Sequence, residues 1–177
     1  FLNDSEIIDE INQIMDEFID DSISNYGNNS NSVNTWDIEG LNNELLESLS
    51  IDISNEIKNI SNSELIKKTI KENMLQIIDY KQNDIGDKIF NHFIKFISLR
   101  EIDKKWKEHL NAMDQMREGI NLRAYGQKNP LIEYKKEGYI LFEEMMLSIN
   151  KEILKTLFRT NLTKVDESKI VIDSSIP

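Results

Sequence analysis

The chain has 177 residues, enough for one or two small domains with a hydrophobic core. Its 32 acidic and 21 basic residues give a net charge of −11, which would repel a phosphate backbone, so we expect no nucleic-acid partner. The absence of Cys excludes disulfides, thiol nucleophiles and thiolate metal sites. Only two Pro and six Gly are present, a composition that favours long helices over many short strands.

Charge divides the chain near residue 62. Residues 1–62 hold 14 acidic and 1 basic residue, whereas residues 63–177 hold 18 acidic and 20 basic. The acidic side chains of the first part lie mostly between apolar positions, as on a solvated helix face, so we expect no metal site. No apolar run approaches the ~20 residues of a membrane-spanning helix. Because Phe1 follows neither a Met nor a basic region, we expect a fragment of a longer chain.

Two helices are predicted in the acidic part. Residues 4–23 place apolar side chains at helical spacing, with Asn3 as a candidate cap. Residues 25–34 are rich in Asn, Ser and Gly and predict a loop. Asp37 is expected to cap the second helix, whose apolar positions lie within residues 38–49.

A third helix is expected after residue 62. Ser61 and Glu64 fit the S-x-x-E pattern of a capping box, and the apolar positions that follow extend to about Gln82. Asp84–Gly86 permits a break before the next helical run.

Two longer helices follow. The first is predicted from about residue 87 to 122, with an ion pair between Glu101 and Lys105. Pro130 suits the first position of a return helix that ends near residue 160. A short connecting loop makes the pair an antiparallel hairpin. The predicted fold class is therefore all-α, a smaller helical subdomain plus a long two-helix hairpin, with residues 161–177 as an extended or disordered tail.

No motif for autonomous catalysis is present. His92 and His109 lack metal-ligand spacing, and neither a phosphate-binding loop nor a nucleophile elbow occurs. We expect no catalytic residue and no metal ligand. The hairpin tip instead gathers four polar or aromatic residues, which suit either contact with another chain or a turn that packs on its own helices. These residues are Arg123, Tyr125, Gln127 and Lys128.

One long motif carries a family resemblance. The run from Trp106 to Lys135 meets the pattern WKEHLxxMDxLRxGIxLRxYxQxxPxxEY at nearly every position. The residues expected to form its structural framework are Trp106, His109, Leu110, Arg117, Gly119, Pro130 and Tyr134. Together with WDIEGL at residues 36–41, this run resembles the SecA preprotein translocase motor. The resemblance covers about residues 1–160. Met116 and Lys105 stand where that family often has Leu.

The resemblance implies an organisation and a function. Residues 1–85 correspond to the helical wing domain, residues 86–160 to the two-helix finger of the helical scaffold domain, and residues 161–177 to a tail. In SecA the finger sits at the mouth of the SecY channel and restrains the ATPase of the motor. By resemblance, Tyr125 contacts the translocating preprotein. The implied partners are an unfolded preprotein, a SecY-type channel and the motor domains of the parent chain.

The resemblance also implies what this stretch lacks. ATP and Mg²⁺ would bind in the missing motor domains, so we expect no cofactor here. The expected location is cytoplasmic and peripheral at the inner membrane, or the stroma and thylakoid-type membrane of a plastid. Without the motor, we expect an exposed apolar stripe near Phe90, Phe93 and Ile97, and weak oligomers.

Two other classes of protein remain open. One is a stand-alone helical adaptor for protein interactions without a motor. The other is a protein that lies on a membrane surface, which the net charge of −11 disfavours.

Overall fold

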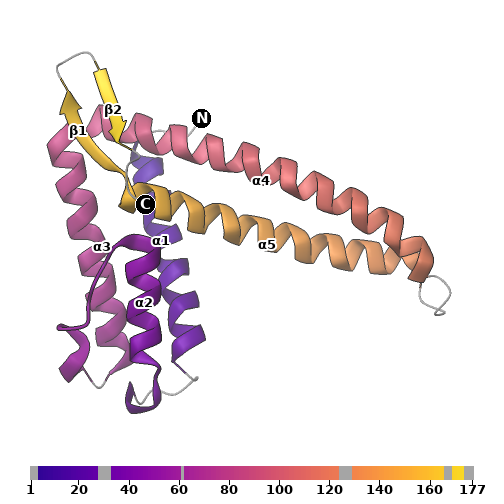
Figure 1. Ribbon diagram of the computed structural model, residues 1–177, viewed down its shortest axis with the longest axis horizontal. Coiled ribbons are helices and arrows are strands. Elements are labelled where there is room, and N and C mark those ends of the chain that lie inside the picture. The colour runs from indigo at the N-terminus through magenta and orange to yellow at the C-terminus, as the bar shows by residue number, and fades with distance from the viewer. Residues whose placement is uncertain (1–3, 28–32, 61, 124–128, 166–168, 174–177) are drawn as a thin grey trace. The chain divides into compact units, whose positions relative to one another are not determined.

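The computed structural model describes residues 4–27, 33–60, 62–123, 129–165 and 169–173. They form the helices α1 (Asp4–Tyr26), α2 (Ile38–Leu49), α3 (Ser63–Ile85), α4 (Asp87–Arg123) and α5 (Pro130–Arg159) (Figure 1). Short 3-10 turns follow α1 and α2, η1 (Val33–Thr35) and η2 (Ile57–Asn59). The strands β1 (Asn161–Val165) and β2 (Lys169–Asp173) end the described chain. The prediction of an all-α fold is confirmed, with a small β ribbon added.

The β ribbon occupies the segment predicted to be extended or disordered. Its strands pair in antiparallel register, with Leu162 opposite Ile172 and Val165 opposite Lys169. Backbone pairing satisfies the amide groups of the two strands. Leu162 is also buried, and β1 packs on α3. The ribbon therefore follows from contact with a helix, because an isolated two-stranded hairpin has little stability in water.

The chain divides into two compact units. One, which we call the bundle unit, comprises residues 1–95 and 154–177. The other, the hairpin unit, comprises residues 96–153. Helices α4 and α5 each pass from one unit into the other along the chain.

The bundle unit has an apolar core between its helices. In it, α1 packs on both α2 and α3, so that one stripe of each helix is removed from water. The buried apolar side chains of these elements are Ile7, Ile11, Ile14, Met15, Phe18, Ile19, Leu41, Leu45, Leu49, Ile66, Ile70, Met74, Ile78, Ile85 and Leu162.

The expected exposed stripe on the start of α4 is wrong. Phe90 and Phe93 are 0% and 5% exposed, because the first turns of α4 belong to the core of the bundle unit. Ile97 is also fully buried. The reason is that these positions face the protein's own helices and need no cover from a motor domain.

The WDIEGL segment shapes the start of α2. Trp36 is buried, and its ring lies close to Gly27, where a Cβ would stand 3.1 Å from two ring carbons. Asp37 caps α2 as predicted, because its Oδ1 accepts from the backbone N of Gly40 at 2.9 Å. A Cβ at Gly40 would collide with this carboxylate and stand 2.7 Å from the ring of Tyr26.

The start of α3 differs from the predicted capping box. Asn62 is the N-cap, and its side-chain oxygen accepts from the backbone N of Glu64 at 2.8 Å. Ser61, the predicted cap, lies outside the described residues, as does Asn3 at the start of α1. From the N-cap position, the side-chain oxygen of Asn62 reaches the N–H of the second helical residue, one of the free donors at the start of α3.

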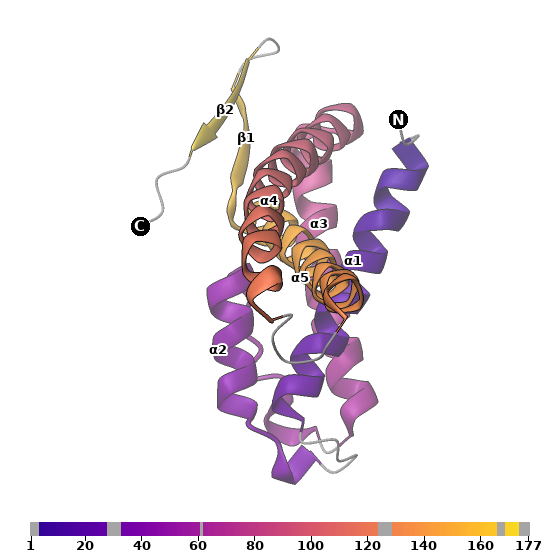
Figure 2. The same ribbon diagram turned by 90° about the vertical axis from the view of Figure 1, so that its right-hand side faces the viewer.

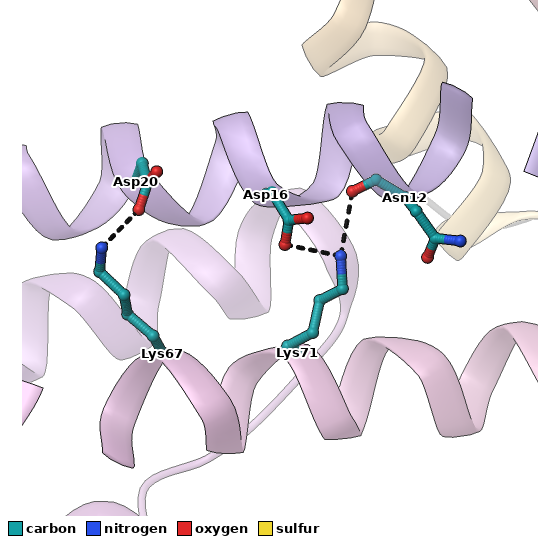
Figure 3. A network of polar contacts seen from close by, with 5 residues as sticks. All are labelled: Asn12, Asp16, Asp20, Lys67 and Lys71. Carbon is teal, nitrogen blue, oxygen red and sulfur yellow. Dashed lines mark hydrogen bonds and ion pairs between the residues drawn. The ribbon is translucent and has the colours of Figure 1, made fainter. Parts of the chain in front are cut away.

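Lysines of α3 pair with carboxylates of α1 across the antiparallel helix contact (Figure 3). Lys67 lies 2.6 Å from Asp20, and Lys71 lies 2.6 Å from Asp16. Lys71 also donates to the backbone oxygen of Asn12 at 3.0 Å. The hydrogen bond that Lys67 donates to the carboxylate of Asp20 raises the pKa of Lys67. The carboxylates are mostly exposed, so these pairs fix the register of the two helices more than they stabilise them.

We predict that Gly40→Ala destabilises the bundle unit. The added Cβ displaces the capping carboxylate of Asp37 or the ring of Tyr26, which costs about 1–3 kcal/mol in the free energy of unfolding. The matched control is Gly119→Ala in α4, where no described atom lies within 4 Å of the added Cβ. That change should stabilise its helix by about 0.5–1 kcal/mol. Urea unfolding measures both, and equal effects would contradict the role given to Gly40.

Candidate functional site: the helical hairpin

The hairpin is built from two long helices that run side by side in opposite directions (Figures 1 and 2). α4 has 37 residues and α5 has 30, which correspond to about 55 Å and 45 Å of helix. The connection between them spans only residues 124–129. The predicted helix, turn, helix order is therefore confirmed, with Pro130 at the first position of α5.

The predicted contact residues lie at this connection. Tyr125, Gln127 and Lys128 lie outside the described residues. Arg123 is the last residue of α4, and the position of its side chain is not described. The return side of the turn is well defined, because the side-chain oxygen of Asn129 accepts from the N of Leu131 at 3.0 Å. Local capping thus starts α5 directly after the tip.

Aromatic side chains join the two helices at the WKEHL motif. The ring of His109 lies 5.6 Å from that of Trp106, between centroids, and 6.1 Å from that of Phe142 in an edge-on arrangement. His109 is half-buried, whereas Trp106 is 46% exposed. The motif therefore contributes one residue to the contact between α4 and α5 and leaves an aromatic surface next to it.

Gly138 is a second point of contact between the helices. A Cβ at this position would stand 3.1 Å from Cε of Met113 and 3.6 Å from Cε of Met116. The missing side chain makes room for these flexible methionines. Met116 thus fills space beside α5, a packing role that its unbranched side chain performs as well as Leu.

The other motif residues are spread along the hairpin. Arg117 pairs with Asp114 one turn earlier at 3.3 Å, on an exposed surface. Leu110 is exposed, and Tyr134 is half-buried on the first turns of α5. The structure therefore distributes these residues over both helices and does not gather them into one pocket.

The predicted Glu101–Lys105 pair is replaced by other partners. Glu101 is buried, and its Oε1 accepts from Nε and Nη2 of Arg100 at 2.9 and 2.7 Å. Lys105 pairs with Glu108 at 3.1 Å. The i,i+4 rule fails here because burial turns Glu101 away from the exposed face on which such pairs form.

Much of the hairpin surface is apolar. The large side chains that are at least two-fifths exposed include Phe96, Leu99, Ile102, Trp106 and Leu110 on α4, and Leu131, Ile132, Tyr139, Ile140, Phe142, Met146 and Leu147 on α5. Surfaces of this kind are typical of regions that contact another polypeptide.

The end of α5 is held by a lysine of α3. Lys81 is 9% exposed, and its Nζ donates to the backbone oxygens of Leu157 and Phe158 at 2.8 Å each and of Thr160 at 2.6 Å. The last carbonyls of a helix lack partners within the helix and carry its negative dipole end. A buried ammonium group therefore satisfies three acceptors at once.

Burial lowers the pKa of Lys81 to about 8, so the group still carries its proton at neutral pH. Our sequence analysis missed this contact. A signal was present, because Lys81 stands three residues after Ile78 and four before Ile85, on the buried stripe of α3. A lysine at a core position is uncommon and calls for a partner.

The described residues contain neither a candidate metal centre nor a membrane-spanning helix. In the part of the chain that the structure describes, no three His, Cys, Asp or Glu side chains gather as metal ligands would. None of the described helices combines the length and apolar character needed to cross a bilayer.

Comparison with known proteins defines the family. The profile of the SecA Wing and Scaffold domain matches residues 1–161, and the chain belongs to this family. It is similar to proteins named protein translocase subunit SecA. That of Leptospira biflexa is 36% identical over 160 residues, which are 87% of this chain and 17% of the relative.

Two other bacterial relatives give the same relation. The SecA subunit of Halothermothrix orenii is 35% identical over 169 residues, or 96% of this chain and 20% of the relative. That of Trichlorobacter lovleyi is 32% identical over 157 residues, which are 88% of this chain and 18% of the relative. The chain thus spans about a fifth of the length of the curated relatives that it matches.

The pKa of Lys81 predicts a pH dependence. With a folded pKa of about 8 and an ordinary value of 10.5, the unfolded chain binds more protons between these values. The cost of burying the charge of Lys81 is therefore removed, and the free energy of unfolding increases, as the pH rises through this range. The difference in unfolding free energy between wild type and Lys81→Met should grow by about 3 kcal/mol from pH 8 to 10.5 and be flat below. A constant difference in urea titrations across this range would contradict the lowered pKa.

Proposed function

We propose that this chain is the wing and finger part of a SecA-type protein translocase, and that the hairpin tip contacts the unfolded preprotein at a SecY-type channel. The observation that carries the proposal is the hairpin itself, two long helices with the family motif along α4 and a short tip between them. A short connection between two long packed helices suits contact with a moving chain.

Tyr125 is the proposed contact residue at the tip. A tyrosine offers a large apolar ring with one polar end, so it grips side chains of many kinds with little demand on sequence. Arg123, Gln127 and Lys128 lie beside it in the sequence. In this proposal their donors meet carbonyl groups and acidic segments of the preprotein or of the channel loops.

The same hairpin is proposed to restrain the motor. Its exposed apolar side chains, such as Trp106 and Leu110, provide a surface for contact with other domains of the parent chain. ATP and Mg²⁺ would be bound by those domains, so this part contributes contact and regulation and no catalysis. The proposal places the protein peripherally at the cytoplasmic side of the inner membrane, or at a thylakoid-type membrane in a plastid.

We predict that Tyr125→Ala in the full-length protein lowers the rate of preprotein translocation about tenfold or more, because the main contact residue of the tip is lost. The matched control is Tyr80→Ala, which removes a 74% exposed tyrosine from α3 in the bundle unit, outside the hairpin unit. The control should translocate at the wild-type rate, and neither change should alter the melting temperature of the protein.

A cross-linking experiment tests contact directly. Tyr125→Cys is combined with a preprotein that carries one Cys and is stalled in the channel. A disulfide that depends on ATP and on the channel supports the proposal. Normal translocation by Tyr125→Ala, together with no cross-link, would contradict it and leave the hairpin as an internal regulator of the motor.

A further inference from the structure

Both legs of the hairpin start from the same end of α3. α4 follows α3 after the single residue Gly86, and α5 ends on Lys81, five residues before Gly86. Lys81, Gly86, the start of α4 and the end of α5 all belong to the bundle unit. The last turns of α3 therefore carry two attachments of the hairpin. One, which we call the covalent root, is the link to α4 through Gly86, and the other, the non-covalent root, is the contact of Lys81 with the end of α5.

The non-covalent root consists of three backbone oxygens, which together suit a cationic side chain with several donors. The ammonium group of Lys81 meets three backbone oxygens within 2.6–2.8 Å, two from the last turn of α5 and one from Thr160. Burying a charge is costly, and an apolar side chain would fill the same core position without that cost. The contact is thus better suited to fixing the end of α5 than to stabilising the core.

The covalent root has the features of a joint. Gly86 has φ +86° and ψ 150°, a region that essentially only glycine occupies. Its N donates to Gln82 at 2.8 Å to close α3, and its oxygen accepts from the N of Phe90 at 3.0 Å to open α4. No described atom lies within 4 Å of a Cβ built there, so side chains do not brace this residue.

We propose that Lys81 is a positioning residue of the finger, which ties the returning helix α5 to α3 so that a movement of α3 carries both legs of the hairpin together. Gly86 lets α4 change direction at the same place. Without Lys81, α4 would remain linked to α3 through Gly86, whereas the end of α5 could shift along α3. A movement of α3 would then no longer be passed equally to both helices of the hairpin. The inference rests on the proposed finger function of the hairpin.

The test uses the full-length protein and measures preprotein translocated per ATP hydrolysed. Lys81→Met removes the three donors and keeps an unbranched side chain one atom shorter, whereas Lys81→Arg keeps a charged donor group. The matched control is Lys88→Met, the same change at an exposed lysine near the start of α4. If Lys81→Met does not fold, Lys81→Gln replaces it, because an amide keeps two donors without a charge.

We expect Lys81→Met to lower the translocation per ATP at least about fivefold, and Lys81→Arg to restore most of it. Lys88→Met should match the wild type. Hydrogen exchange in the last turn of α5 should become about tenfold faster or more in Lys81→Met, as the anchor is lost. The ratio is independent of how much protein is folded, so a merely structural role would not change it.

Two results would overturn the inference. If exchange in α5 speeds up while translocation per ATP stays at the wild-type value, Lys81 only holds the fold together. If Tyr125→Ala, measured alongside, leaves translocation unchanged, the finger function itself fails and the inference fails with it. A loss with Tyr125→Ala but not with Lys81→Met overturns the positioning role alone.

Discussion

The contact between Lys81 and the end of α5 fixes the position of the last turn of α5 against α3 within the bundle unit. Three carbonyl groups at the end of a long helix enter a region from which water is largely excluded, and an unpaired acceptor there is costly. The ammonium group of Lys81 supplies a donor to each and opposes the negative end of the helix dipole. Arg159 repeats this arrangement on a smaller scale, because its Nη1 donates to the backbone oxygen of Glu47 near the end of α2 at 2.8 Å. Cations at helix ends thus link elements that the apolar core alone would leave free to slide.

The sequence predicted what local chemistry decides. Apolar spacing located every long helix, Asp37 was identified as a cap, and Pro130 as the start of α5, because each depends on residues within one or two turns. The partner of Lys81 lies 76 residues away or more, and no local pattern names it. The β ribbon was missed for the same reason, since its burial depends on α3. At the candidate site, composition identified a tip between two helices, while the role of Tyr125 rests on the family motif alone.

The hairpin surface is consistent with a part that works within a larger chain. Two neighbouring contacts, the His109 aromatic cluster and the Gly138 contact, join α4 and α5 in one region of the hairpin. Outside these contacts, many large apolar side chains of the hairpin unit remain exposed, whereas most of those in the bundle unit are buried, with Leu46, Leu65 and Tyr80 as exceptions. This difference separates an exposed apolar surface on the hairpin unit from a bundle unit with a core of its own.

Recognition through main-chain atoms has a consequence for sequence divergence. Every residue except proline offers the same backbone groups, so the acceptors that Lys81 contacts do not depend on which side chains occupy positions 157, 158 and 160. The side chains of Leu157 and Phe158 are constrained by their own burial and not by the contact with Lys81. Because all three acceptors are backbone oxygens, the side-chain requirement of this anchor falls on one residue of α3, Lys81. Substitutions at the end of α5 that keep its packing would leave the anchor in place.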